Sequence, residues 1–568
     1  MIQESRVKKR NILPIGTSDF RELRRDGSYY IDKSLAIQEL MENNTRVYLL
    51  PRPRRFGKTL LQTTFRYFFE KEEENNEWLF KDLAIYKTET FEKHFAKYPV
   101  IYLTFKDVKE SSFEMNFDKI ATLIRVEFNR HEDMINRVVD KASREDREIY
   151  KKIISNRASE NDYKNSLKVL SKLLFLSYNQ QVVFLLDEYD TPIQTAFFNK
   201  YYDDMMNFFK PFLGGALKDN DRYLKKAVIT GILRVSGESM FSDVNNLEVC
   251  TILYKTFSTS CGFTINETQK MLADFGLEEK QEKIIDWYDG YNFAGETILN
   301  PWSLINYIKN DEFNPYWANT SSNSLIRTMV ENSQMFRKDL KVLINGGSIE
   351  KIIDSNITFD NPNFFYNDEI LYSFLFFSGY LKCNNRRRDA NENTICDLTI
   401  VNVECRYIFS KIVRGWLNSS FQNYKLQEML KALTNGELKL FEKLFSIFVK
   451  ETLSFYDTAK NPENVYHAFL LGILVHLGEY EVISNQEAGF GRLDVMILHK
   501  MDKSRPAIVM ELKTIDEFDE ETKDGALKSA VKQIEEKEYI TTANRRGYYN
   551  ICAFGLVFEG KRAWVREV

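Results

Sequence analysis

Short apolar runs alternate with amphipathic stretches along roughly the first 250 residues of the chain. The runs are rich in β-branched and aromatic residues, which predicts buried strands. They are Val47–Leu50, Pro99–Phe105, Val182–Asp190 and Lys226–Val235. Between them, Leu60–Phe69 and residues 113–178 repeat apolar positions at helical spacing. Strands that alternate with helices form parallel sheets, so we expect an α/β domain in this part of the chain.

The first apolar run leads into a loop, Arg52–Thr59, that ends in Gly57-Lys58-Thr59 just before a helical stretch. Strand, loop, Gly-Lys-Thr and helix form the arrangement of a phosphate-binding loop. The N–H groups at a helix N-terminus attract anions. We expect Lys58 to contact the β- and γ-phosphates and the Thr59 hydroxyl to ligate Mg²⁺. Arg52 stands where the usual first glycine would be, so the full consensus pattern is not met.

The third apolar run ends in an acidic pair, Asp187-Glu188. In a nucleotide-binding sheet, this position supplies a carboxylate for Mg²⁺ and a base that activates water. A buried strand that simply reaches solvent is the alternative, but the order after a Gly-Lys-Thr loop favours the site. In the fourth run, Thr230 is placed to sense the γ-phosphate and Arg234 to stabilise transferred charge. A surface ion pair explains Arg234 equally well.

Composition and charge narrow the class of protein. The chain is 43% hydrophobic and 28% charged, which is ordinary for a globular protein, and its net charge of −4 excludes a uniformly basic nucleic-acid coat. The six cysteines and five histidines show no paired spacing, so we expect reduced thiols, a cytoplasmic location and no structural zinc. The densest apolar run, Ile370–Leu381, is too short to span a bilayer, so we expect no membrane association.

The middle of the chain carries aromatic turn motifs, WYDGY at 287–291 and NPWS at 300–303. Sugar binding by these aromatic residues is conceivable, but packing at a domain joint is the simpler interpretation. Asn300 or Ser303 is expected to cap the helix that follows. A polar loop with three arginines, Arg386–Arg388, separates two β-like segments. These arginines either contact the phosphate backbone of a nucleic acid or lie in solvent at the tip of a hairpin.

Two β-rich runs near the C-terminus, Gly489–Leu498 and Ala507–Thr514, flank a short polar turn and predict a hairpin. Side chains alternate between the two faces of a strand. Folding the hairpin about its turn brings Asp494 opposite Glu511 and Lys513. The sequence therefore predicts two carboxylates and a lysine that converge at one end of the hairpin.

This trio suits phosphodiester hydrolysis. Asp494 and Glu511 provide the hard oxygen ligands that Mg²⁺ prefers, and a metal held there would polarise a phosphate and lower the pKa of a bound water. Lys513 would orient that water or stabilise the developing charge. Glu463, on a preceding helical stretch, offers a further acid, and Gln533, on a later one, is placed to orient the water or a phosphate.

Taken together, these motifs resemble one bacterial and archaeal family, the AAA-ATPase-like proteins with a C-terminal PD-(D/E)xK nuclease domain. The segments that carry the resemblance are LPRPRRFGKT at 50–59, FLLDEYD at 184–190, TGILRVSGESMFSDVNNL at 230–247, WYDGY, NPWS, YHAFLLG at 466–472, GFGRLDV at 489–495 and ELK at 511–513. The resemblance implies a P-loop AAA-ATPase-like domain with a parallel sheet at 1–250. It also implies a mainly helical lid and connecting region at 251–455, and an α/β restriction-endonuclease-like PD-(D/E)xK domain at 456–568.

The same resemblance makes Arg52–Thr59 a glycine-poor Walker A loop and Asp187-Glu188 a Walker B motif, with ATP and Mg²⁺ as cofactors. The nucleotide-binding residues that we expect are Arg54, Arg55, Gly57, Lys58, Thr59, Leu60, Asp187, Thr230 and Arg234. The expected catalytic residues are Glu463, Asp494, Glu511, Lys513 and Gln533 in the nuclease and Glu188 in the ATPase. The expected metal ligands are Thr59, Asp187, Asp494 and Glu511.

Two classes of function follow from these expectations. In the first, the protein binds ATP, hydrolyses it, and cleaves DNA with Mg²⁺, and ATP gates the cleavage. In the second, it is a nucleotide-binding regulatory or interaction module whose nuclease-like domain holds DNA or a partner without cutting. An ATP-driven motor or helicase fits less well, because the sequence shows no second ATPase core. DNA is the expected partner, and a homo-oligomer is compatible with all three.

Overall fold

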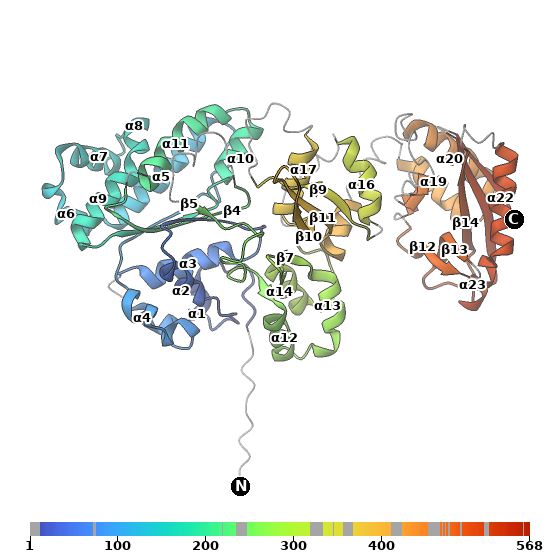
Figure 1. Cartoon of the computed structure of the whole chain (residues 1–568), viewed down its shortest axis with the longest axis horizontal. Coiled ribbons are helices and arrows are strands. Elements are labelled where there is room, and N and C mark those ends of the chain that lie inside the picture. The colour runs from blue at the N-terminus through green and yellow to red at the C-terminus, as the bar shows by residue number, and fades with distance from the viewer. Residues whose placement is uncertain are drawn as a thin grey trace, which may run out of the picture. The chain divides into compact units, whose positions relative to one another are not determined.

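A computed structural model gives the structure of the chain, which divides into two compact units. The first unit comprises Met1–Asn332 and Ser348–Cys405, and the second comprises Ser333–Gly347 and Arg406–Val568 (Figure 1). The structure describes residues 12–71, 75–218, 220–234, 247–317, 333–344, 346–355, 367–410, 423–452, 466–467, 470–471, 473–474, 477–488, 491–515, 522–559 and 562–568. The three regions expected from the sequence stay predictions, and residues 251–332 belong to the same compact unit as the first sheet.

The first unit is built on a five-stranded parallel sheet with the order β2-β3-β4-β1-β5. Its strands are β1 (Val47–Pro51), β2 (Val100–Thr104), β3 (Val182–Asp187), β4 (Leu224–Gly231) and β5 (Leu247–Val249). Every residue of β1 and β3 is buried, which explains their unbroken apolar runs: a central parallel strand is covered on both faces. The α/β class expected from the sequence is confirmed.

Helices cover both faces of this sheet. The first four lie on one side and the next seven on the other (Figure 1). They are α1 (Phe20–Arg25), α2 (Leu35–Glu42), α3 (Lys58–Phe69), α4 (Glu89–His94), α5 (Phe113–Arg130), α6 (Glu132–Asn136), α7 (Arg144–Ile154), α8 (Glu160–Lys164), α9 (Ser166–Tyr178), α10 (Thr191–Phe198) and α11 (Tyr202–Leu217). Short 3-10 turns occur at Asn76–Leu79, Ala84–Lys87, Val139–Lys141 and Glu278–Lys280.

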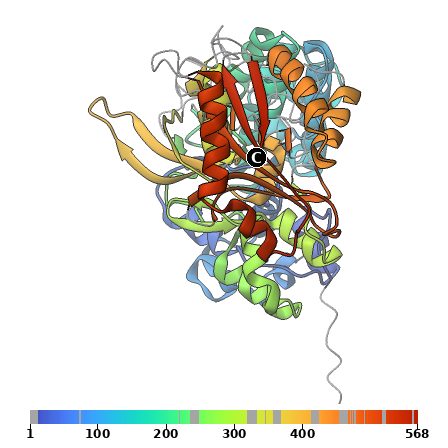
Figure 2. The ribbon, with the colours of Figure 1, turned by 90° about the vertical axis from the view of Figure 1, so that its right-hand side faces the viewer.

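The middle of the chain contains two small antiparallel sheets as well as helices. One has the order β6-β8-β7 and the other β10-β11-β9. The elements are β6 (Phe263–Thr264), α12 (Ile265–Asp274), α13 (Gln281–Tyr288), β7 (Tyr291–Phe293), β8 (Glu296–Leu299), α14 (Pro301–Asn310), β9 (Ile349–Ile352), α17 (Asp368–Phe377), β10 (Leu381–Arg388) and β11 (Thr394–Ile400). Figure 2 shows β10 and β11 as a long hairpin in light orange. Strands β6 to β8 are too short to give a period in the sequence, so the helical expectation missed them.

The second unit holds a mixed five-stranded sheet with the order β12-β13-β14-β15-β16. Strands β14 and β15 run parallel, and the other neighbours are antiparallel. The elements are α16 (Gln334–Ile344), α19 (Asn423–Thr434), α20 (Leu438–Thr452), β12 (Tyr480–Ala488), β13 (Gly491–His499), β14 (Ala507–Thr514), α22 (Lys523–Glu536), α23 (Tyr539–Arg545), β15 (Ile551–Glu559) and β16 (Arg562–Glu567). Among the described residues of both units, no helix has the length and apolarity to cross a bilayer.

Two apolar clusters cover opposite faces of the second sheet. On one face, Phe441 and Phe445 of α20 lie against Phe554 and Phe558 of β15, with 5.9 Å between ring centroids in both pairs. On the other face, α22 and α23 pack against alternate residues of β13 and β14. Helix α22 crosses β15 at Gly555, where an added Cβ would lie 2.7 Å from the Cβ of Ala530. Glycine is therefore required there for the helix to lie close to the sheet.

Candidate functional site

The loop between β1 and α3 turns sharply into its helix. Gly57 caps α3 with a left-handed φ of +87°, and Arg55 also has a positive φ of +68°. Glycine adopts such angles at little cost, whereas they strain an arginine backbone. The turn leads directly to the N-terminus of α3, where N–H groups without helical partners attract anions. Backbone strain at Arg55 is of the kind that collects at ligand-binding loops.

Arg52 explains how the loop departs from the glycine-rich consensus. Its guanidinium is buried and donates to the carbonyls of Pro51 at 2.8 Å, Cys250 at 2.6 Å and Phe257 at 2.8 Å. The side chain therefore lies against the segment after β5, where it acts as an anchor. A large residue at the usual glycine position is accommodated because its side chain is bonded to these carbonyls.

Lys58 is held inside the loop. Its buried ammonium donates to the carbonyl oxygens of Arg52 at 3.2 Å and Pro53 at 3.1 Å. Charge-assisted bonds to an anion are stronger than bonds to neutral carbonyls. A phosphate group placed in the loop would therefore draw Lys58 away from these carbonyls, as its expected role requires.

Asp187 collects hydroxyl groups at the end of β3. Its carboxylate accepts from Thr59 at 2.8 Å, Thr230 at 2.6 Å and Thr104 at 3.3 Å. Burial raises the pKa of the Asp187 carboxyl, while the hydrogen bonds from Thr230 and Thr59 oppose that shift. The structure thus brings together three of the expected residues. Thr104, at the end of the neighbouring strand β2, was missed, although the position of that strand end was predictable.

The other two residues expected near the phosphates differ in their placement. Glu188 has a positive φ of +52° and a half-buried side chain that accepts from Thr191 Oγ1 at 3.3 Å. It lines a cavity together with Lys58. Arg234 follows β4 and does not belong to the described residues that line this cavity. Its Nε is buried and has no hydrogen-bond partner within the described part of the chain, so its expected role stays a prediction.

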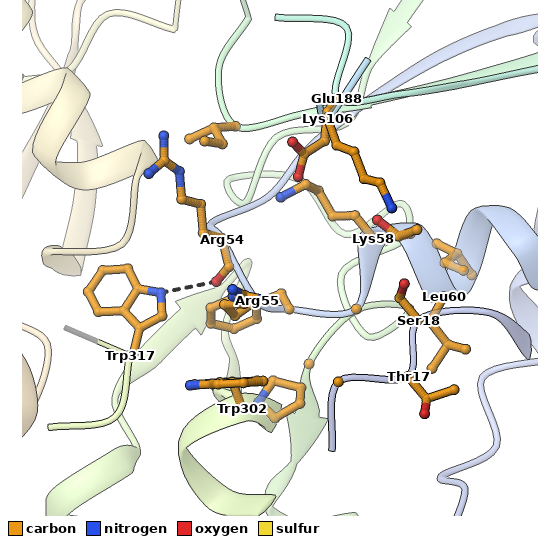
Figure 3. Close-up of a pocket in the computed structure, with 18 of the residues that line it drawn as sticks. Thr17, Ser18, Arg54, Arg55, Lys58, Leu60, Lys106, Glu188, Trp302 and Trp317 are labelled. Atoms are coloured by element: carbon orange, nitrogen blue, oxygen red, sulfur yellow. Dashed lines mark hydrogen bonds between the residues drawn. The ribbon is translucent and has the colours of Figure 1, made fainter. Parts of the chain in front are cut away.

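The cavity lies entirely in the first unit and has a volume of about 740 Å³. This size is typical of sites for small organic ligands. Cationic side chains outnumber acidic ones along its wall. The cations are Lys33, Arg54, Arg55, Lys58, Lys106 and Lys109, and the acids are Asp107 and Glu188. Figure 3 shows Lys58, Lys106 and Glu188 gathered above the loop. Such a wall favours an anionic ligand.

Two tryptophans from the middle of the chain contact the phosphate loop. The guanidinium carbon of Arg55 lies 4.6 Å from the ring centroid of Trp302, and Trp317 Nε1 donates to the carbonyl of Arg54 at 3.1 Å (Figure 3). Asn300 caps α14 by accepting from the Trp302 N–H at 2.9 Å, as expected. The contact of the NPWS motif with the phosphate loop was not foreseen from the sequence.

The predicted C-terminal hairpin is confirmed. Strands β13 and β14 are antiparallel, with Val495 opposite Met510. Asp494 Oδ2 accepts from the N–H of Leu512 at 2.9 Å, and Lys513 Nζ lies 3.8 Å from Glu511 Oε1. The side chain of Glu511 is buried and that of Lys513 is partly exposed.

Helices α22 and α23 bring further polar groups to this trio. Burial raises the pKa of Tyr539, the nearby carboxylates of Glu511 and Asp494 act in the same direction, and a hydrogen bond with Gln533 opposes them. Gln533 therefore reaches the same neighbourhood as the two carboxylates. Tyr539 was missed because it follows α22 in sequence with no motif of its own. Glu463, the further acid expected from the sequence, lies outside the described residues.

The chemistry of the donors suits Mg²⁺ at both places. Thr59 and Asp187 offer a hydroxyl and a carboxylate, and Asp494 and Glu511 offer two carboxylates. Hard oxygen ligands of this kind select Mg²⁺ over softer metals. Within the described ranges, no group of three or more His, Cys, Asp and Glu side chains is arranged to hold a metal ion. Each place offers two protein oxygen donors, which suits Mg²⁺ sites that water and phosphate complete.

Comparisons with known proteins match both parts of the chain. Residues 14–241 match the family described as predicted AAA-ATPase, and residues 461–568 match the PD-(D/E)XK nuclease superfamily. A curated protein of Azotobacter chroococcum, described as an uncharacterized protein in the vnfD 5' region, is 27% identical over 338 residues. The alignment covers 58% of each of the two proteins. A solved Walker-type ATPase of Pyrococcus abyssi aligns over 68% of this chain and 97% of its own, with 12% identity and a TM-score of 0.34.

Proposed function

Because this chain joins a predicted AAA-ATPase region to a region of the PD-(D/E)XK nuclease superfamily, we propose that it hydrolyses ATP and cleaves DNA phosphodiesters, both with Mg²⁺. The nuclease half of the proposal rests on one observation, the placement of Asp494 beside Glu511 and Lys513 on neighbouring strands. A pair of carboxylates that can bind a metal, together with a lysine, is what phosphodiester hydrolysis requires and what simple DNA binding does not.

ATP binding is supported by the bond between Thr59 and Asp187. It places a hydroxyl and a carboxylate side by side at the N-terminus of α3, where phosphates are attracted. In this proposal Lys58 leaves its loop carbonyls for the β- and γ-phosphates, and Glu188 takes a proton from the attacking water. The Glu188 carboxylate accepts a hydrogen bond from Thr191 Oγ1, and the residue lines the cavity wall.

DNA cleavage is assigned to the groups at the end of the β13–β14 hairpin. Asp494 and Glu511 would hold Mg²⁺, and Lys513 would orient the attacking water and stabilise charge on the phosphate. Gln533 is placed to hold that water or a phosphate oxygen. At both sites a bound Mg²⁺ would polarise a phosphate oxygen and offset the negative charge of the transition state.

We further propose that ATP binding gates cleavage. The test uses Lys58→Ala, with Lys87→Ala as the matched control because Lys87 is an exposed lysine of the same unit. Lys58→Ala should abolish ATP hydrolysis and the response of DNA cleavage to ATP, and Lys87→Ala should change neither. The proposal that ATP gates cleavage is wrong if ATP changes DNA cleavage by Lys58→Ala as much as it changes cleavage by the unsubstituted protein. The proposal that the protein hydrolyses ATP is wrong if the unsubstituted protein releases no phosphate from ATP at any Mg²⁺ concentration.

A further inference from the structure

The cavity of the first unit changes character from one end to the other. Near Lys58 its wall is charged, with Lys106 and Glu188. The wall also carries apolar and aromatic residues, with Phe263, Trp302 and Ile305 among them, and Figure 3 shows Trp302 apart from Lys58. A triphosphate requires only the charged end. The apolar and aromatic side chains around Trp302 do not bind phosphates. Aromatic walls of this kind bind flat rings.

Trp302 is the flat side chain at the apolar end, and its orientation is fixed. Its Nε1 donates to the carbonyl of Tyr316 at 3.3 Å, and its backbone is bound into the cap of α14 by Asn300. One ring face carries the Arg55 guanidinium at 4.6 Å. Figure 3 shows Arg55 between the phosphate loop and the indole ring. The planar guanidinium of Arg55 thus lies over one face of the indole ring, and both residues line the cavity.

We propose that this ring face is the binding site for the base of the nucleoside triphosphate. The base stacks on Trp302 in place of the Arg55 guanidinium, and the released arginine turns to the phosphates. Stacking on an aromatic side chain accepts any base, because every base has a π-face. The inference rests on the proposed binding of ATP and adds the site of the base. Trp302 lies beyond residues 14–241, the part that matches the predicted AAA-ATPase family.

A buried carboxylate supports the aromatic wall. Glu404 is fully buried and accepts from Ser303 Oγ at 2.8 Å and from the Trp317 N–H at 2.5 Å. Ser303 follows Trp302 at the start of α14, and Trp317 donates to the loop carbonyl of Arg54. Glu404 therefore acts as a positioning residue that holds both tryptophans in place beside the phosphate loop.

The opposite wall is fixed to the same helix as the phosphate-binding residues. Thr17 and Ser18 line the cavity across from Trp302 in the view of Figure 3. The Ser18 carbonyl accepts from Thr63 Oγ1 at 3.2 Å, and Thr63 belongs to α3, which begins with Lys58. The wall that faces Trp302 is thus tied to α3, the helix that carries Lys58 and Thr59.

The test compares two ligands, ATP and inorganic tripolyphosphate, each with Mg²⁺, on the full-length protein. Tripolyphosphate carries the phosphates without the base. Trp302→Ala should weaken ATP binding by about tenfold or more, the usual effect of losing one base–aromatic stack, and leave tripolyphosphate binding unchanged. Trp302→Phe should restore most of the ATP affinity. Lys58→Ala should weaken the binding of both ligands.

Tryptophan fluorescence provides a readout that a folding defect would not imitate. ATP should change the emission of the unsubstituted protein, and this response should be lost in Trp302→Phe. Trp287→Phe is the matched control, because Trp287 packs on Phe313 outside the cavity. The inference is overturned if Trp302→Phe keeps the full change of emission on adding ATP. It is also overturned if Trp302→Ala weakens the binding of ATP and of tripolyphosphate equally. If the unsubstituted protein binds neither ligand, the proposed ATP function fails as well.

Discussion

The hydroxyl of Thr59 donates a 2.8 Å hydrogen bond to Asp187 across 128 residues of sequence. It joins the helix behind the phosphate loop to the strand that ends in the acidic pair. Both oxygens belong to residue types that ligate Mg²⁺ in nucleotide sites. The bond therefore brings together the two side chains that we propose as Mg²⁺ ligands, although they lie far apart in the sequence.

Removing this hydroxyl should weaken nucleotide binding. Thr59→Ala loses a hydrogen bond to a carboxylate and a metal ligand, so we expect about a tenfold or greater loss of Mg²⁺–ATP affinity. Thr59→Ser keeps the hydroxyl and should bind almost as tightly as the unsubstituted protein. Calorimetric titration with and without Mg²⁺ measures the effect. Equal affinities for the alanine and serine variants would show that the hydroxyl plays no part.

Mg²⁺–ATP binding should also depend on pH through Asp187. Burial raises the pKa of this carboxyl in the folded protein, so its stabilising contribution is present at low pH and is lost as the pH rises through the raised pKa. Metal binding requires the ionised form, so Mg²⁺–ATP affinity should fall as the solution is acidified toward that pKa. Asp187→Asn does not titrate and should bind weakly at every pH. A wild-type affinity that is constant during acidification would contradict this account.

Glu404 should matter to ATP binding without touching the ligand. Glu404→Ala leaves the Ser303 hydroxyl and the Trp317 N–H unsatisfied, which costs about 1–3 kcal/mol for each buried group. We expect a lower melting temperature, a shifted tryptophan emission and a severalfold weaker affinity for ATP. Glu404→Gln can still accept one of the two bonds and should be intermediate in all three measurements.

The control for this pair is Glu392→Ala, which removes an exposed acid of the same unit. It should leave melting, emission and affinity unchanged. If Glu404→Ala melts earlier but binds ATP normally, then Glu404 has a structural role only, and the tryptophans need no positioning.

Substitution of Gly555 tests the packing of α22 against the sheet that carries Asp494, Glu511 and Lys513. It pairs with Glu511 on the neighbouring strand, and a Cβ there would lie 2.7 Å from the Cβ of Ala530. Gly555→Ala should therefore push α22 away from the sheet and destabilise the protein by about 1–3 kcal/mol. Gly478→Ala, where an added Cβ meets nothing within 4 Å, is the matched control. Denaturant unfolding measures both, and equal stabilities would show that α22 adjusts freely.

The sequence predicted those parts of the fold whose signal is local. Strand β3 was found because its apolar run is continuous, and the β13–β14 hairpin because two such runs flank a polar turn. The alternation of side chains between the two faces of a strand then correctly predicted that Asp494 lies near Glu511. The contact of Trp302 with Arg55 spans 247 residues and leaves no local pattern, so only the structure could show it. The same holds for Tyr539, which reaches the carboxylates through the packing of α23.

The central claim is that the C-terminal trio cleaves DNA, and cleavage of linear, circular and single-stranded DNA with Mg²⁺ tests it most directly. Each substrate should be tested with and without ATP, using the unsubstituted protein, Lys513→Ala and, as a control, Lys528→Ala, which removes an exposed lysine of α22. The account predicts cleavage by the unsubstituted protein and by Lys528→Ala, and a loss on the order of a hundredfold in Lys513→Ala. Cleavage by Lys513→Ala at the unsubstituted rate, or ATP binding with no cleavage of any substrate, would contradict it. The second result would favour a regulatory module that binds nucleotide without cutting DNA.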